Sequence, residues 1–111
     1  MQKGLSIGIM KDLAQVGQER GIRFKDKYFY HEDMMCKIAG YWIPSTMHEI
    51  MTVLPRDLGA LEDDVCSHYM TSTDDNCWIA GYMYMAEEKA PELVDALGKL
   101  LVWAIKEGWL G

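Results

Sequence analysis

One segment near the end of the chain has the pattern of a complete amphipathic helix. Residues 91–108 read PELVDALGKLLVWAIKEG. Pro91 suits the first turn of a helix, and Gly108 suits the left-handed residue that follows one. Between them, apolar residues recur every three or four positions: Leu93, Val94, Leu97, Leu100, Leu101, Ala104 and Ile105. This pattern predicts a helix that buries one face against a core.

Two apolar residues of the same segment project away from that stripe. Val102 is one, and Trp103 lies about 120° from the centre of the stripe on a helical wheel. Tryptophan anchors many protein interfaces because it buries a large area at a small entropic cost. With Trp109 and Leu110, these residues predict a partner-binding surface. The alternative is that Trp103 packs beneath the N-terminal helix or the segment 22–30.

The rest of the sequence predicts a mainly α fold, a compact bundle of five or six short helices. Apolar spacing indicates a first helix from Leu5 that ends at Gly21, and further helices at 31–39, 46–54, 57–69 and 72–89. Thr46 and Glu49 have the spacing of a capping box. The 111 residues fit one domain, 1–111, because this is near the commonest domain size.

Two segments, 22–30 and 72–89, leave the type of structure open, and a third, 41–44, predicts a connection. Residues 22–30 alternate apolar and charged side chains, which favours either a small β-hairpin or an extended connection. Residues 41–44 read as an apolar, buried link. Residues 72–89 are apolar on every side around Trp78 to Met85, as in a central buried helix, although alternation over 82–85 leaves a strand as the alternative.

The charge of the chain bears on its partners. The net charge is -6 and the basic residues are scattered, which argues against nucleic acid because phosphate binding needs clustered lysine and arginine. Acidic residues are grouped at Glu62, Asp63 and Asp64. The group is either a solvated helix face or a surface that docks on a basic protein.

The sequence also predicts where the protein works. Three cysteines without framework spacing argue against a secreted disulfide scaffold and favour the reducing cytoplasm. No apolar stretch approaches the roughly 20 residues that span a bilayer. We therefore expect a cytoplasmic protein with no membrane contact.

Catalytic and metal-binding motifs are absent from the sequence. There is no CxxC or HExxH pattern and no glycine-rich phosphate loop. A cysteine nucleophile assisted by a histidine would need groups that meet in space, which spacing alone does not show. We therefore expect no catalytic residues, no metal and no cofactor.

Two hypotheses for function remain. The first is a protein-binding module that regulates or inhibits a partner, a basic protein being favoured, and that forms a homodimer. The second is a small enzyme or small-molecule-binding domain with an aromatic pocket and a histidine as its polar group. The candidate pocket residues are Trp42, Trp78, Tyr82 and Tyr84, with His48 or His68.

Overall fold

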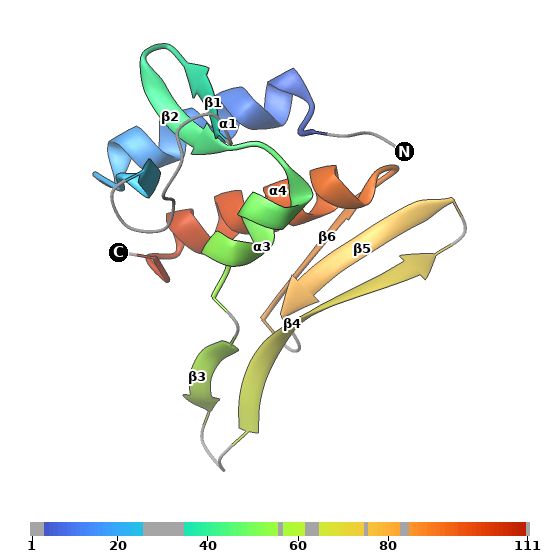
Figure 1. Ribbon diagram of the computed structural model, residues 1–111. Helices are drawn as coiled ribbons and strands as arrows, with labels where there is room; N and C mark the ends of the chain where they lie inside the picture. The colour runs from blue at the N-terminus through green and yellow to red at the C-terminus, as the bar shows by residue number, and fades with distance from the viewer. Residues whose placement is uncertain are drawn as a thin grey trace.

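The computed structural model describes residues 4–25, 35–55, 57–61, 65–74, 76–82 and 85–110. In this part of the chain there are three helices and six strands (Figure 1). The helices are α1 (Ile7–Glu19), α3 (Met47–Val53) and α4 (Leu93–Lys106). The strands are β1 (Met35–Ile38), β2 (Tyr41–Pro44), β3 (Asp57–Leu61), β4 (Val65–Asp74), β5 (Cys77–Tyr82) and β6 (Ala86–Ala90).

The predicted bundle of five or six helices is wrong. The fold is a mixture of helices and antiparallel sheets: β1 and β2 form one sheet, and the other has the order β3-β4-β5-β6. Within each sheet, consecutive strands pair, so the chain needs only short turns between them.

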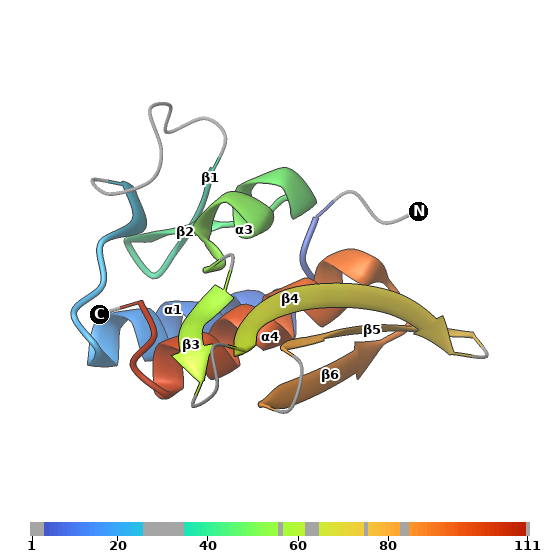
Figure 2. The same cartoon turned by 90° about the horizontal axis from the view of Figure 1, so that it is seen from below.

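Helix α4 is the central element and confirms the helix predicted over 91–108. It contacts α1 and α3 as well as β5 and β6, and so lies between the larger sheet and the remaining elements (Figures 1 and 2). The predicted stripe is core, since its residues from Val94 onward are at most 3% exposed. The helix begins at Leu93, two residues after Pro91, which was predicted to be its first residue, and Glu92 is the residue just before it. Gly108 has φ of 83° and ends it as predicted.

Helix α3 is also confirmed, because its start signal is local. The Thr46 hydroxyl oxygen accepts a hydrogen bond from the Glu49 backbone N–H at 3.3 Å, which satisfies one of the free donors at the helix start. The chain leaves the helix at Leu54, just before Pro55. Helix α1 matches the first predicted helix, and Gly21, with φ of 69°, follows its end.

The helix predicted over 31–39 is wrong where the structure describes it. Residues 35–38 form β1, and β1 returns as β2 through a two-residue turn at Ala39 and Gly40. Both turn residues have positive φ, 52° and 81°, which matches the tight turn that fits the twist of two paired strands. The predicted apolar link at 41–44 is therefore a strand, and its last two residues, Ile43 and Pro44, are buried.

The hairpin predicted over 22–30 is not found in the described part of that segment. Ile22 and Arg23 have no strand pairing, and Phe24 and Lys25 are helical. Residues 26–30 lie outside the described residues.

The helices predicted over 57–69 and 72–89 are wrong, because these segments supply β3 to β6. Tyr82, Ala80 and Trp78 share one face of β5, and the first two are buried next to α4. Ala90 and Glu88, opposite Trp78 and Ala80 on β6, lie on that face too. The strand alternative for 72–89 is correct in β4, β5 and β6. Within 82–85, whose alternation suggested it, only Tyr82 is in a strand; Met85 lies in the turn before β6, and residues 83 and 84 lie outside the described residues.

Candidate functional site

Trp103 packs against Tyr82 of β5 in the larger sheet. Its ring centroid lies 5.9 Å from that of Tyr82, with the rings tilted by 36°. Tyr82 is itself fixed, because it is 1% exposed and its hydroxyl donates to the Pro55 carbonyl oxygen at 2.7 Å. Trp103 remains half-buried. Tyr82 therefore holds one side of the Trp103 side chain in place, while another part of it is exposed to solvent.

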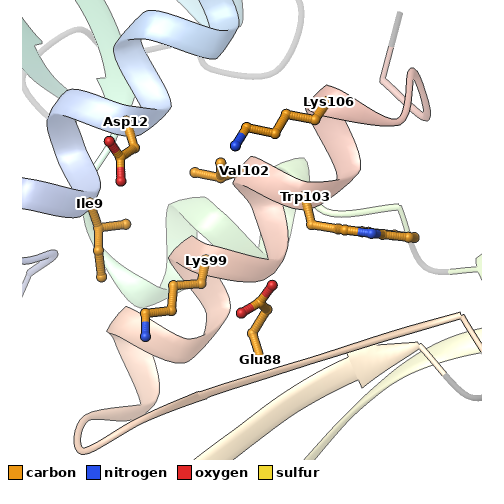
Figure 3. A pocket seen from close by; sticks show the side chains of 7 residues that line it. All are labelled: Ile9, Asp12, Glu88, Lys99, Val102, Trp103 and Lys106. Atoms are coloured by element: carbon orange, nitrogen blue, oxygen red, sulfur yellow. The ribbon is translucent and has the colours of Figure 1, made fainter.

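The outward part of Trp103 lines an open cleft of about 210 Å³ between α1, α4 and β6 (Figure 3). We call it the Val102–Trp103 cleft. Three of its lining residues are apolar and four are charged: Ile9, Val102 and Trp103, then Asp12, Glu88, Lys99 and Lys106. The apolar members are all half-buried, so a molecule in the cleft would remove additional apolar surface from water.

The cleft is lined by equal numbers of positive and negative side chains, and the two kinds come from different elements. Lys99 and Lys106 come from α4, whereas Asp12 comes from α1 and Glu88 from β6. Figure 3 shows the two carboxylates on opposite sides of α4, with the lysines along the helix between them. The Lys99 ammonium also donates to the Lys89 carbonyl oxygen at 2.8 Å.

The α1 side of the cleft is fixed by contacts near the start of the chain. Asp95 of α4 accepts hydrogen bonds from the Ser6 backbone N–H at 2.9 Å and from the Ser6 hydroxyl at 2.5 Å. Gly98 lets α1 come close, since a Cβ there would lie 3.0 Å from Ile9 Cγ2 and closer still to Leu5. At the other end of α1, the Arg20 guanidinium donates to the Lys106 carbonyl oxygen. These contacts hold Ile9 and Asp12 beside Val102.

The structure separates the residues predicted to form a partner-binding surface. Val102 and Trp103 lie together in the cleft. Trp109 is 40% exposed beyond the end of α4, whereas Leu110 is buried and belongs to the core. The acidic residues Glu62, Asp63 and Asp64 lie outside the described residues.

The predicted aromatic pocket is not brought together in the described part of the chain. Trp42 lies on β2 in a different cleft, with Arg23 and Lys25, and the Lys37 ammonium is 5.4 Å from its ring centroid. Trp78 is half-buried on β5, and Tyr82 is buried under Trp103.

The structure describes the two candidate histidines and Tyr84 only in part. His48 is exposed on α3. His68 belongs to β4, where its side chain lies outside the description, and so does the whole of Tyr84.

Sequence reasoning missed most of the cleft. Lys99 and Lys106 could have been found, since they lie three or four positions from Val102 and Trp103 and therefore share their side of the helix. Ile9, Asp12 and Glu88 carry no such signal, because only the packing of α1 and β6 on α4 brings them there.

Another cleft and two buried polar atoms lie elsewhere in the described residues. A wider cleft of about 500 Å³ lies between α1 and the β1–β2 turn, and its lining residues are Lys11, Ala14, Gln15, Gln18, Glu19, Ile38 and Ala39. Tyr41 Oη and Glu49 Oε1 are buried without a hydrogen-bond partner among the described residues. Burial raises the pKa of the Tyr41 hydroxyl. In the same part of the chain, no group of three histidine, cysteine or acidic residues is placed to hold a metal ion.

Comparison with known proteins adds no relative. No family model, no curated protein and no solved structure matches this chain. Of the helices within the described residues, none is both long and apolar enough to cross a membrane.

Proposed function

We propose that this protein is a protein-binding module that acts as a regulator or inhibitor, and that the Val102–Trp103 cleft is its protein-contact surface. The observation that carries the proposal is a tryptophan held on the sheet, with one side left open in a cleft whose floor is apolar. Aromatic anchors surrounded by a polar rim provide most of the binding energy in many protein interfaces.

The support beneath Trp103 favours binding for an energetic reason. A side chain that is already fixed loses little conformational entropy when a partner covers it. Tyr82 fixes the ring, and Tyr82 is anchored in turn by its hydrogen bond to Pro55. The cleft is therefore suited to bind a protein chain without first having to become ordered.

The experiment is site-specific crosslinking followed by reconstitution. A photo-crosslinking phenylalanine analogue is placed at Val102, in the cleft, or at Met51, an apolar position 40% exposed on α3, as the control. We expect position 102, and not position 51, to form a covalent adduct with one defined protein in the native cell.

The crosslinked protein is then identified and tested in purified form. Val102→Gln should weaken its binding and Met51→Gln should leave it unchanged, because only the first removes apolar surface from the cleft. Equal crosslinking from both positions, or equal binding by both variants, would overturn the proposal.

A further inference from the structure

We infer that the occupant of the Val102–Trp103 cleft is a second copy of this chain, in a two-fold symmetric dimer; this inference rests on the function proposed above. In such a dimer one surface must be complementary to itself, so that each contact occurs twice. The cleft meets this requirement through the arrangement of its charges.

The cleft has no net charge, which favours a second copy of this chain as its partner. Its rim carries two lysines and two carboxylates, so it is neutral, although the whole chain has a net charge of -6. The excess negative charge therefore lies elsewhere on the molecule. A basic partner would be attracted to that other surface, whereas a balanced rim matches a rim with the same balance.

The order of these charges favours two α4 helices that cross. Lys99 and Lys106 are separated by about 10.5 Å along α4, and Val102 lies between them. The carboxylates stand to either side of that helix, Asp12 on α1 and Glu88 on β6 (Figure 3). Parallel alignment of two copies would place lysine against lysine.

Crossing the helices at Val102 removes this repulsion. Helices that pack with their ridges in each other's grooves commonly cross at about 50°. Each end of one α4 then lies over the elements that flank the other α4, which brings its lysines toward the partner's carboxylates. The apolar residues of the two clefts then face each other around the crossing point.

The dimer is tested first by measuring the mass of the purified protein. Sedimentation equilibrium at physiological salt, over a wide range of concentration, should show a reversible monomer–dimer equilibrium. Val102→Gln should weaken the dimer by roughly 10-fold or more, because the lost apolar contact occurs in both copies. Met51→Gln should leave it unchanged.

Charge exchange between copies is the decisive experiment. Lys99→Glu with Lys106→Glu gives an acidic variant, and Asp12→Lys with Glu88→Lys gives a basic variant. Each variant alone should fail to dimerise, because like charges would face each other. An equimolar mixture should form a heterodimer, and this mixed pair has the same total charge as the dimer of the unchanged protein.

Controls with the same change in charge are available away from the cleft. Lys11→Glu with Lys37→Glu matches the acidic variant, and Glu19→Lys with Glu87→Lys matches the basic one. All four positions are exposed, and Glu87 lies on the opposite face of β6 from Glu88. These controls should dimerise much as the unchanged protein does, and mixing them should bring no gain.

The outcomes separate the dimer from the broader function. A protein that stays monomeric at every concentration overturns the dimer, as does a mixture that does not associate. If position 102 then crosslinks to a different polypeptide, the dimer is wrong and the proposed function stands. If position 102 crosslinks to no protein, both are wrong. Recovery of association only in the mixture of cleft variants supports the dimer.

Discussion

Gly98 and Gly8 are both helical, but the space around them predicts opposite effects of alanine. A Cβ at Gly98 would lie 3.0 Å from Ile9 Cγ2 and still closer to Leu5 Cδ2. A Cβ at Gly8 would meet no atom of the described residues within 4 Å. Gly98→Ala therefore adds a methyl group to a filled contact between α1 and α4, whereas Gly8→Ala adds it to open space.

The magnitude follows from two opposing effects. Alanine stabilises a helix by about 1 kcal/mol relative to glycine in its interior, and we take about half of that near the helix start. Forcing a methyl group into a packed interface costs about 1–3 kcal/mol. We expect Gly98→Ala to lower the free energy of unfolding by about 1 kcal/mol and Gly8→Ala to raise it by about 0.5 kcal/mol.

The contact at Gly98 is not relieved by a small movement of the chain. Leu5 is buried, and its backbone N–H donates to the Ser45 carbonyl oxygen at 2.8 Å. Its neighbour Ser6 is held by Asp95. Moving the Leu5 backbone would disturb these hydrogen bonds, and rotating the buried Leu5 side chain would displace its core neighbours, so making room for the methyl group carries a cost.

Urea unfolding followed by circular dichroism and tryptophan fluorescence measures both effects. The measurement uses the difference in midpoint at unchanged slope, which reports a change in stability. If Gly98→Ala stabilises the protein as much as Gly8→Ala does, then α1 and α4 are not in close contact at this position, and the reasoning is refuted.

Three further predictions concern buried polar groups. Ser6→Ala and Asp95→Ala should each lower the free energy of unfolding by about 2 kcal/mol in urea titrations, and the double variant should cost less than their sum because they share one interaction; strict additivity would contradict the contact. Tyr82→Phe should cost about 1 kcal/mol, since it leaves the Pro55 carbonyl without its donor, and an unchanged urea midpoint would contradict this. Burial raises the pKa of Tyr41 above its usual 10.0, so the folded state holds the proton more tightly than the unfolded state. The resulting stability is complete below pH 10 and is lost as the pH rises through the folded pKa, so Tyr41→Phe should reduce the alkaline fall in melting temperature; an equal fall in both proteins would argue against burial of that hydroxyl.

The elements predicted correctly are those whose signals are local. α3 has a capping threonine and a proline just beyond its end, and α4 has a long apolar stripe. Both signals act within a few residues and do not depend on distant parts of the chain. The sequence therefore predicted these helices without knowledge of the fold.

Strand β5, in the middle of the larger sheet, was missed because it does not show a clear alternation. Residues 77–82 are all at least half-buried on both faces of β5, so apolar residues follow one another without a polar position between them. Such a run fits a buried helix as well as a strand, and pattern alone does not separate them. The partners that decide between them, β4 and β6, become apparent only in the folded chain.

The β1–β2 hairpin was missed for a different reason. Its turn is made by Ala39 and Gly40, both with positive φ. The residue pairs typical of this turn are asparagine or aspartate followed by glycine, because alanine rarely adopts a left-handed conformation. The sequence therefore carried only the glycine, which also fits the end of a helix.

A carboxylate in the first turn of a helix can have more than one role, and Asp95 is an example. In the first turn of a helix, a carboxylate is explained by the partial positive charge at the helix start. Here the same carboxylate binds both the backbone and the hydroxyl of Ser6, 89 residues earlier in the chain. Its position thereby sets where α1 begins relative to α4.

The geometry of the cleft depends on the hydrogen bonds between Asp95 and Ser6, near the start of the chain. Ile9 and Asp12 reach the cleft only because α1 lies along α4, and the Ser6–Asp95 contact and the close approach at Gly98 fix that arrangement. Val102 and Trp103 are on α4 itself and would remain in place without α1. Loss of the Ser6–Asp95 hydrogen bonds should therefore weaken binding, because α1 would no longer line the cleft. Trp103 should stay packed on Tyr82.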